Sequence, residues 1–491
     1  MPIVLGVDLG TTKITSIAID TASGAILASG STANEANITC PEDRARGRSE
    51  WRADLIVVAA CRCLSDVARQ LGSRANEVVG LGVTGQQHGM LLVDPNLQPI
   101  SPLINWQDRR ALDRMPNGDS TWLEAARTAI GRDAGQRTGC WLHPGFMAVT
   151  LFELTVRKRV PANARALFVM DYFTAALTGQ SPITEPSCAG SSGVFNVRSR
   201  QWDEAGIEAL GLSRSLFPDI REANETVGGL TSEHAHATGL PTGTLVFAPI
   251  GDHQASFLGS VADRRNSVLV NVGTGAQVAV YTDDFNFEAP IELRPFPCGG
   301  NLLSNVGLAG GWSYQVLERF FCGVGRDLYQ TDSEEKLYGL MNELAATVPP
   351  GADGLCCEPR FSGTRLDPTQ RGSITGLSPQ NFTAEHLARA VLEGMSRSLH
   401  DGFKAIRRVT DHSPTTQETL AASPTMLIAA GNGLRENPLL AEIVSQEFGL
   451  PMSFTQHREE AAFGAALVAC VGTKVFANLE EAAKSLVLCH D

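Results

Sequence analysis

The sequence lacks the features that mark membrane, secreted and metal-cluster proteins. No apolar run approaches the ~20 residues needed to cross a bilayer, and residues 3–9 read as a strand rather than as a leader. The 11 cysteines form no C-x-x-C pair, which removes the usual zinc spacing and favours a reducing compartment. We therefore expect a cytoplasmic protein with no membrane partner.

Basic charge is also scarce. The chain has 40 Lys and Arg against 53 Asp and Glu, a net charge of −13, and no dense basic block. Binding to a nucleic-acid backbone requires a basic stripe, so we expect no nucleic-acid partner. Small phosphorylated ligands stay open, because backbone amides can hold phosphate. With 491 residues, 43% of them hydrophobic and 19% charged, the chain is typical of a globular protein of roughly two to four domains.

Short strands and helices alternate along the chain, which predicts an α/β fold. The elements expected in the first half are strands at 3–9, 15–20, 25–29 and 78–83, and a helix at 54–71. In the second half, the strand at 268–272 carries Asn271 before Gly273-Thr274, just as the first strand carries Asp8 before Gly10-Thr11. This echo predicts a duplicated domain. Pro, Gly and Thr cluster near 241–249, so we place the two domains at 1–247 and 248–491.

Three glycine turns follow apolar strands: Gly10-Thr11-Thr12-Lys13, Gly273-Thr274-Gly275 and Gly431-Asn432-Gly433. Glycine lets the backbone approach a ligand, and successive amides make a concavity for anionic oxygens. Any one of them alone is better explained as a tight hairpin turn. Three together, with Asp8 beside the first, indicate a nucleotide site. The P-loop and the G-x-G-x-x-G fingerprints are absent, so neither common nucleotide fold applies.

Eight segments, in a fixed order along the chain, resemble one known family. They are residues 6–12, 85–89, 106–109, 251–254, 271–275, 372–377, 431–433 and 460–466. The chain is similar to the FGGY family of carbohydrate kinases, within the actin/hexokinase/Hsp70 superfamily. The resemblance implies two ribonuclease H-like domains that flank a nucleotide and sugar cleft, with ATP and Mg²⁺ as cofactors.

The resemblance also implies the catalytic residues. Asp252, at the end of a strand, would take the proton from a sugar hydroxyl that attacks the γ-phosphorus. From spacing alone, Asp252 is equally an N-cap for a helix at 254–260. Asp8 resembles the family's metal-associated carboxylate, which suits Mg²⁺ because this ion takes one carboxylate together with phosphate oxygens and water.

For ATP, the resemblance assigns the phosphates to the first two turns and adenosine to the third. The implied ATP-binding residues are Gly10, Thr11, Thr12, Lys13, Gly273, Thr274, Gly431, Asn432, Gly433 and Asn437. Lys13 has an alternative as a solvated surface lysine. For the sugar, the candidates are Gln87, His88, Trp106, Asp108 and Asp252. His88 could hydrogen-bond a hydroxyl or be structural, Trp106 offers an apolar face, and Asp108 could accept from two hydroxyls.

The choice of sugar rests on departures from the xylulokinase pattern. Gln87 replaces a methionine, and residues 149–153 lack the expected lysine and tryptophan. The triplet at 106–108, Thr150 and the segment 450–454 are similar to sedoheptulokinases. We therefore expect a ketose kinase with sedoheptulose as its substrate, and xylulokinase or another pentulose or polyol kinase as the alternative. Thr364 departs from both patterns.

Two other classes of function stay open from the sequence. One is a non-catalytic sugar sensor on a kinase scaffold, and the other is a chaperone-like ATPase of the superfamily. Retention of Asp8, Asp252 and all three turns argues against the sensor, and nothing resembles a peptide-binding domain. The expected partners are a small-molecule sugar and ATP. The oligomeric state, a homodimer included, is left open.

Overall fold

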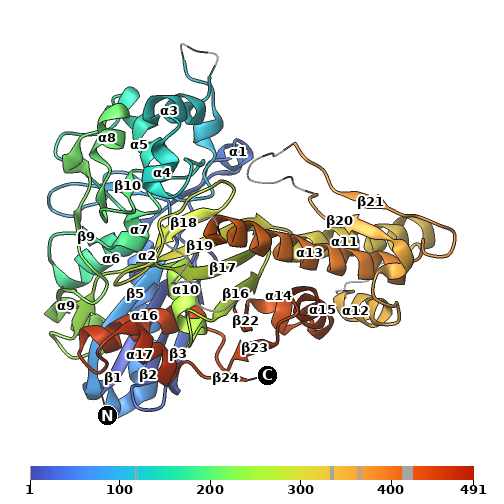
Figure 1. Ribbon diagram of the computed structural model, residues 1–491. Coiled ribbons are helices and arrows are strands. Elements are labelled where there is room, and N and C mark those ends of the chain that lie inside the picture. The colour runs from blue at the N-terminus through green and yellow to red at the C-terminus, as the bar shows by residue number, and fades with distance from the viewer. Residues whose placement is uncertain are drawn as a thin grey trace.

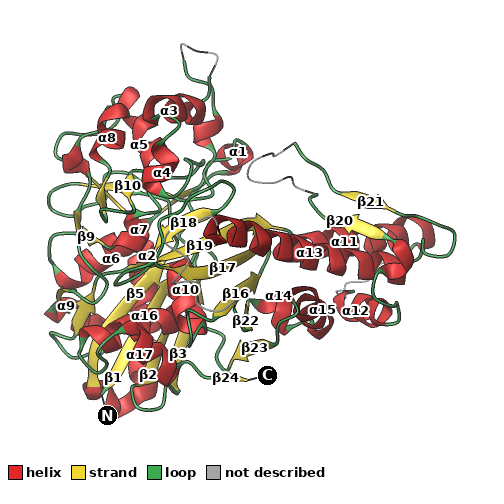
Figure 2. Cartoon of the chain, in the orientation of Figure 1, coloured by secondary structure: helices red, strands yellow, loops and turns green. Residues whose placement is uncertain are grey.

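The computed structural model describes residues 2–116, 118, 120–331, 337–361, 363, 367, 369–411 and 424–490. Two large β-sheets form its centre, and helices lie between and around them (Figure 1 and Figure 2). Within the described ranges, no helix is both long and apolar enough to cross a membrane. Thr364, whose identity departs from both sugar-kinase patterns, lies outside the described residues.

The first sheet has the order β13-β14-β5-β1-β2-β3, and β15 pairs with the end of β5. Its strands are β1 (Ile3–Leu9), β2 (Lys13–Asp20), β3 (Ile26–Ala33), β5 (Val78–Gly85), β13 (Thr226–Gly229), β14 (Leu245–Phe247) and β15 (Ile250–Gly251). The strands β1, β2 and β3 are antiparallel, whereas β5 runs parallel to both β1 and β14. The predicted meander at the start of the chain is therefore confirmed.

The second sheet repeats this topology. It contains β16 (Ser267–Val272), β17 (Ala276–Thr282), β18 (Glu292–Pro295), β19 (Asn301–Leu308), β22 (Met426–Ala430), β23 (Met452–Thr455) and β24 (Cys489–His490). Here β16, β17 and β19 form the antiparallel meander, and β22 and β23 add parallel to β16. Asp8 and Asn271 are each the second-last residue of the first strand of their sheet. The echo in the sequence thus reflects two domains of one α/β topology, as expected.

The other helices cover faces of the sheets, build the upper part of the first half of the chain, or extend to the right beside the second sheet (Figure 1). They are α1 (Pro41–Ala45), α2 (Ala53–Leu71), α3 (Trp122–Ile130), α4 (Ala134–Thr138), α5 (Met147–Val156), α6 (Val169–Thr178), α7 (Pro186–Ala189), α8 (Glu204–Ala209), α9 (Ser232–Thr238), α11 (Gly311–Tyr329), α12 (Tyr338–Ala346), α13 (Ala384–Asp411), α14 (Asn432–Arg435), α15 (Pro438–Phe448) and α17 (Leu479–Leu486). The short strands are β4 (Glu50–Trp51), β6 (Leu91–Val93), β7 (Leu103–Ile104), β8 (Arg165–Leu167), β9 (Ile183–Thr184), β10 (Phe195–Asn196), β11 (Gln201–Trp202), β12 (Asp219–Ile220), β20 (Cys356–Glu358) and β21 (Ser373–Thr375).

Two helices, α10 (Asp252–Ser260) and α16 (Glu460–Gly472), lie between the sheets (Figure 1). The two helices approach each other closely, and α16 approaches β1 and β5 closely, so that the contact positions have room only for glycine. A Cβ on Gly6 would lie 1.9 Å from the carbonyl oxygen of Ala462, and one on Gly464 would lie 1.9 Å from that of Ala255. We call these backbone contacts the glycine seam. Through the seam, α16, a helix near the end of the chain, packs on the first sheet. The domain boundary between residues 247 and 248 remains a prediction.

Candidate active site

Asp252 is the first residue of α10, directly after the short strand β15. The N-cap of this helix is Gly251, and the Asp252 Oδ1 atom accepts from the adjacent His253 amide at 2.8 Å. The N-cap alternative for Asp252 is therefore wrong, because the helix begins two residues earlier than the sequence suggested. Its carboxyl is instead directed to a pocket, which it lines.

A buried hydrogen-bond network fixes the backbone at Asp252. The Gly251 amide donates to the Ser187 Oγ atom at 2.9 Å, and the Ser187 hydroxyl donates to the Glu185 carboxyl. The Gln87 Nε2 atom donates to the Ser187 carbonyl at 2.9 Å and to Gln254 Oε1 at 3.0 Å. Burial raises the pKa of Glu185 to about 8. The network therefore holds the backbone directly before Asp252 in place.

The two candidate carboxyls have raised pKa values. Burial raises the pKa of Asp252 to about 6. The pKa of Asp8 rises to about 7, first because of burial and then because Asp252 and Glu459 repel its charge, while Lys13 opposes the rise. A buried base with a pKa just below neutrality is ionised at pH 7 and still basic enough to accept a proton.

A polar pocket of about 390 Å³ opens at Asp252. The lining residues come from both halves of the chain and are Gln87, His88, Trp106, Asp252, His253, Ser256, Asn271, Gln277, Glu292, Arg294, Val306 and Ala461. The structure thus brings together four of the five sugar-binding candidates. Sequence reasoning missed the residues of β17, β18 and β19, because no motif connects them to the strand ends that carry the other candidates.

His88 and Trp106 each have a structural contact as well as a face on the pocket. The His88 ring stacks on Phe146, with centroids 4.4 Å apart, and His88 Nδ1 lies 3.0 Å from the Ser191 carbonyl oxygen. The Trp106 side chain is 39% exposed, and its indole Nε1 donates to Thr11 Oγ1 at 2.9 Å. The two aromatic rings are therefore oriented before a ligand arrives.

Asp108 does not line this pocket. It is 1% exposed, and its carboxylate accepts from the Ser49 amide at 2.8 Å and from the Arg110 guanidinium at 2.8 and 3.0 Å. The expectation that Asp108 accepts sugar hydroxyls is not supported, because a structural ion pair occupies its oxygens. Spacing could not separate these roles, since Asp108 lies two residues from Trp106.

The first phosphate turn, at residues 10–13, lies beside the sugar pocket. Thr11 Oγ1 donates to Gln86 Oε1 at 3.2 Å, which holds the turn on the end of β5. Thr12 is exposed. Lys13 Nζ donates to the two Glu459 carboxylate oxygens at 3.0 and 3.2 Å. The first turn therefore presents two threonines, and its lysine is engaged with a carboxylate from just before α16.

The second and third turns meet at another pocket, of about 480 Å³. Gly273, Thr274, Asn432, Gly433 and Asn437 of the predicted ATP-binding set all line it. Gly431 is not in its lining; this residue packs against Val272, where a Cβ would lie 2.5 Å from the carbonyl oxygen.

Much of the wall of this second pocket comes from residues that no sequence motif singles out. The additional lining residues include Trp312, Tyr314, Tyr338, Asn342 and Met395. The Tyr314 and Tyr338 rings are stacked with centroids 6.0 Å apart, and the Tyr314 hydroxyl donates to Asn342 Oδ1 at 2.9 Å. Aromatic faces beside glycine backbone suit a planar base, and Thr274 adds a hydroxyl group to the lining that could bind a phosphate oxygen.

Asp8 has the properties expected of a Mg²⁺-associated carboxylate. Its Oδ1 atom is buried without a hydrogen-bond partner among the described residues, and so are the hydroxyls of Thr15 and Thr84, which lie opposite Asp8 on the two neighbouring strands. No group of three or more His, Cys, Asp or Glu that could hold a metal occurs in the described part of the chain. A single carboxylate with unfilled polar neighbours fits an ion that keeps its waters and binds phosphate oxygens.

Comparison with known proteins agrees with this geometry. Residues 3–259 match the model of the FGGY family of carbohydrate kinases, N-terminal domain, and residues 300–473 match its C-terminal domain. The chain is 26% identical to a xylulose kinase of Lactococcus lactis, over 99% of this chain and 91% of that protein. It is 29% identical to the human sedoheptulokinase, over 95% of this chain and 97% of that protein.

Solved structures show the same fold. A xylulose kinase from Rhodospirillum rubrum superposes with a TM-score of 0.86 at 23% identity, covering 100% of this chain and 93% of that chain. A gluconate kinase from Lactobacillus acidophilus superposes with a TM-score of 0.84 at 19% identity, with the same coverage. At these identities the structural likeness establishes the architecture and leaves the substrate to the residues of the pocket.

Proposed function

Because the chain belongs to the FGGY family of carbohydrate kinases, we propose that it transfers the γ-phosphoryl group of ATP to the terminal hydroxyl of a ketose, with sedoheptulose as the substrate. As a member of this family, the protein is a phosphotransferase with an alcohol acceptor and uses ATP as the donor. The finer proposals are the ketose, the role of each residue and the use of Mg²⁺.

The placement of Asp252 carries this proposal. Its carboxyl lies in a polar pocket that residues from both halves of the chain line, and its backbone is fixed through Ser187. In the proposed reaction, Asp252 accepts the proton of the sugar hydroxyl as the hydroxyl oxygen bonds to the γ-phosphorus and the bond to the β-phosphate bridging oxygen breaks. The protonated Asp252 then returns its proton to solvent.

The two phosphate turns would position the donor. The amides of Thr11, Thr12 and Thr274 and the hydroxyls of Thr12 and Thr274 are suited to phosphate oxygens, whereas the Thr11 hydroxyl donates to Gln86 and the Gly273 amide to the Gly275 carbonyl. A Mg²⁺ ion associated with Asp8 would supply neutralisation of the phosphate charge. The chain's own contribution is to orient two ligands, exclude water, and hold a base at the acceptor hydroxyl.

Sedoheptulose is favoured over xylulose by residues that depart from the xylulokinase pattern, namely Gln87 and the segment 149–153. Relatives of both names match along nearly the full chain, so xylulose stays the second candidate. Thr150 is 2% exposed on α5 and is not among the residues that line the pocket at Asp252.

Two measurements test the proposal. Asp252→Asn keeps the size of the side chain and removes the base, so we expect kcat to fall by about 10²–10⁴-fold while ATP affinity changes little. A variant with more than a tenth of the wild-type kcat would contradict the role of Asp252.

In a coupled ADP-release assay with C4 to C7 ketoses, we expect the highest kcat/KM with sedoheptulose. An equal or higher value with D-xylulose or D-ribulose would reverse the choice of substrate.

A further inference from the structure

The strand β18 belongs to the second sheet by its pairing but is attached to the first half of the chain. It pairs with β19, where Glu292 lies opposite Ser304. Its Leu293 amide donates to the Gly139 carbonyl at 2.8 Å, and the Pro295 carbonyl accepts from Gln254 Nε2 at 3.0 Å. These hydrogen bonds hold β18 as a fixed wall of the sugar pocket.

Two charged residues of β18 form a buried ion pair at this wall. Glu292 is 6% exposed and Arg294 is 3% exposed, and the guanidinium donates to Glu292 Oε2 at 2.8 and 3.1 Å. Arg294 also donates to the Gly190 carbonyl at 2.8 Å, and its guanidinium lies 5.4 Å from the Phe146 ring centroid. Because Phe146 stacks on His88, the ion pair is connected to His88 through the Phe146 ring.

Burying an ion pair costs desolvation energy that Coulomb attraction alone often fails to offset. A well-packed apolar pair would serve a purely structural wall at least as well. This pair nevertheless lines the same pocket as Asp252. A carboxylate accepts hydrogen bonds from two hydroxyls, and a guanidinium donates to a carbonyl or hydroxyl oxygen. The chemistry of the pair therefore suits the polyhydroxylated and carbonyl-bearing end of a ketose.

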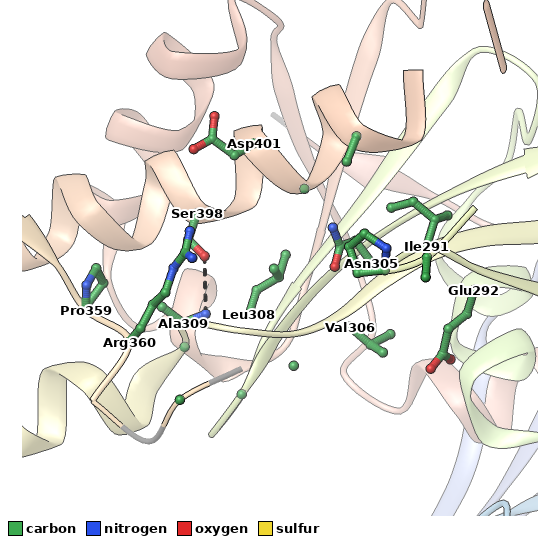
Figure 3. Close-up of a pocket in the computed structure, with 18 of the residues that line it drawn as sticks. Ile291, Glu292, Asn305, Val306, Leu308, Ala309, Pro359, Arg360, Ser398 and Asp401 are labelled. Atoms are coloured by element: carbon green, nitrogen blue, oxygen red, sulfur yellow. Dashed lines mark hydrogen bonds between the residues drawn. The ribbon is translucent and has the colours of Figure 1, made fainter. Parts of the chain in front are cut away.

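The pocket has room beyond this ion pair. Glu292 and Val306 also line an adjoining pocket of about 560 Å³, whose walls include Trp141, Phe287 and Ile291. Figure 3 shows this adjoining pocket, with Glu292 at one end of its labelled residues and Pro359 and Arg360 at the other. A ligand that starts at Asp252 and passes Glu292 can therefore extend into open space.

We propose that Glu292 and Arg294 bind the end of the ketose opposite to the phosphorylated hydroxyl, and that the adjoining pocket admits the additional carbons of a long-chain ketose. The inference rests on the proposed ketose kinase activity and deepens it. His253 connects the two ends of the pocket, because it follows Asp252 and its Nε2 atom lies 2.8 Å from Ser304 Oγ, opposite Glu292. Selectivity for chain length is thus assigned to β18.

The test compares ketoses of increasing length in wild type and variants. In Glu292→Gln, the ratio of kcat/KM for sedoheptulose to that for erythrulose should fall at least tenfold, because only the longer sugar reaches a charged hydrogen-bond partner at this wall. The loss should appear in KM, with kcat for sedoheptulose kept within threefold. The matched control is Glu222→Gln, which removes one partner of the Arg200–Glu222 pair outside this pocket.

A second variant keeps the proposal testable if Glu292→Gln does not fold. Val306→Phe narrows the passage between the two pockets without removing a charge, and it should lower the same ratio at least tenfold. Val58→Phe, on the exposed face of α2, is its matched control. Melting curves of all four variants establish that each is folded at the assay temperature.

The outcomes separate the two claims. If wild type phosphorylates none of the C4 to C7 ketoses, the proposed function fails. If wild type is active but Glu292→Gln and Val306→Phe each lower kcat/KM by one common factor for every ketose, or leave it unchanged, the role of β18 in chain length is overturned. A selective loss for the longer sugars in both variants supports it.

Discussion

Lys13 Nζ donates to both carboxylate oxygens of Glu459, at 3.0 and 3.2 Å, and this ion pair ties the first phosphate turn to the residue before α16. The side chains of Lys13 and Glu459 are 49% and 30% exposed, so the pair itself adds only about 0–1 kcal/mol to stability. Its larger effect is electrostatic, because the two charges act on Asp8 in opposite directions.

Variants of this pair should move the pH dependence of nucleotide binding in opposite directions. Glu459→Gln removes a negative charge that raises the pKa of Asp8, so half-maximal MgADP binding should occur at lower pH. Lys13→Met removes a positive charge that lowers this pKa, so the midpoint should move to higher pH. Calorimetric titrations of MgADP binding measure both pH midpoints. They should cover roughly pH 5.5 to 8.5, because the pKa of Asp8 is about 7. Lys484→Met, which breaks an exposed pair with Glu480, is the control; equal shifts in all three variants would contradict the assignment.

The activity should follow the ionisation of Asp252. Since burial raises the pKa of Asp252 to about 6, the base is protonated and inactive below that pH and ionised above it. We expect kcat/KM for the sugar, measured at saturating MgATP, to rise tenfold per pH unit well below this pKa and to level off about one unit above it. A profile that is flat between pH 5 and 7 would show that another group accepts the proton.

Asp252→Asn should stabilise the protein at high pH. Between the ordinary pKa of 3.8 and the folded value of about 6, the folded chain keeps a proton that the unfolded chain releases. Stability contributed by this group is therefore present below pH ~4 and is lost as pH rises through 6. At pH 8 the neutral variant should gain about 1–3 kcal/mol in the free energy of unfolding, and it should match wild type near pH 4.

Urea unfolding without nucleotide or metal measures this difference. The exposed substitution Asp327→Asn is the control, because Arg326 lowers the pKa of Asp327, and it should not raise the free energy of unfolding at pH 8. A destabilised Asp252→Asn at pH 8 would mean that the folded protein stabilises the charged carboxylate rather than the neutral one.

The glycine seam should be the least tolerant part of the fold. Gly464→Ala would place a Cβ 1.9 Å from the Ala255 carbonyl oxygen, so we expect a loss of at least 1–3 kcal/mol in the free energy of unfolding. Gly339, on α12, has no atom within 4 Å of an added Cβ. Gly339→Ala should therefore be neutral or stabilising by up to about 1 kcal/mol, as helix propensity dictates. Equal effects of the two substitutions in urea titrations would contradict the close packing.

The sequence predicts those features of the fold that depend on residues close together in the chain. The meander at residues 3–29 and the helix at 54–71 follow from hydrophobic periodicity and turn residues, and the duplication follows from the repeat of Asp8 at Asn271. The walls of the pockets could not be foretold in the same way. Glu292, Arg294, Tyr314 and their neighbours reach the site through sheet order and helix packing, which periodicity does not encode.

Asp108 illustrates the limit most clearly. A motif places a residue near a site, but the role of its side chain depends on which donors surround it after folding. Arg110 and the Ser49 amide occupy the Asp108 carboxylate, and Ser49 is far from Asp108 in sequence. The extent of the helix at Asp252 was missed for a related reason, because its start is set by the pairing of Gly251 with Gly85 on β5.

The double attachment of β18 has a consequence for the order in which substrates bind. Its hydrogen bonds to Gly139, Gly190 and Gln254 order the sugar-binding wall when the protein folds. Sugar binding therefore does not lose the conformational entropy of ordering this wall. The sugar should then bind the enzyme before any nucleotide is present. Initial-rate kinetics should accordingly place the ketose on the free enzyme, with a dissociation constant that nucleotide changes little.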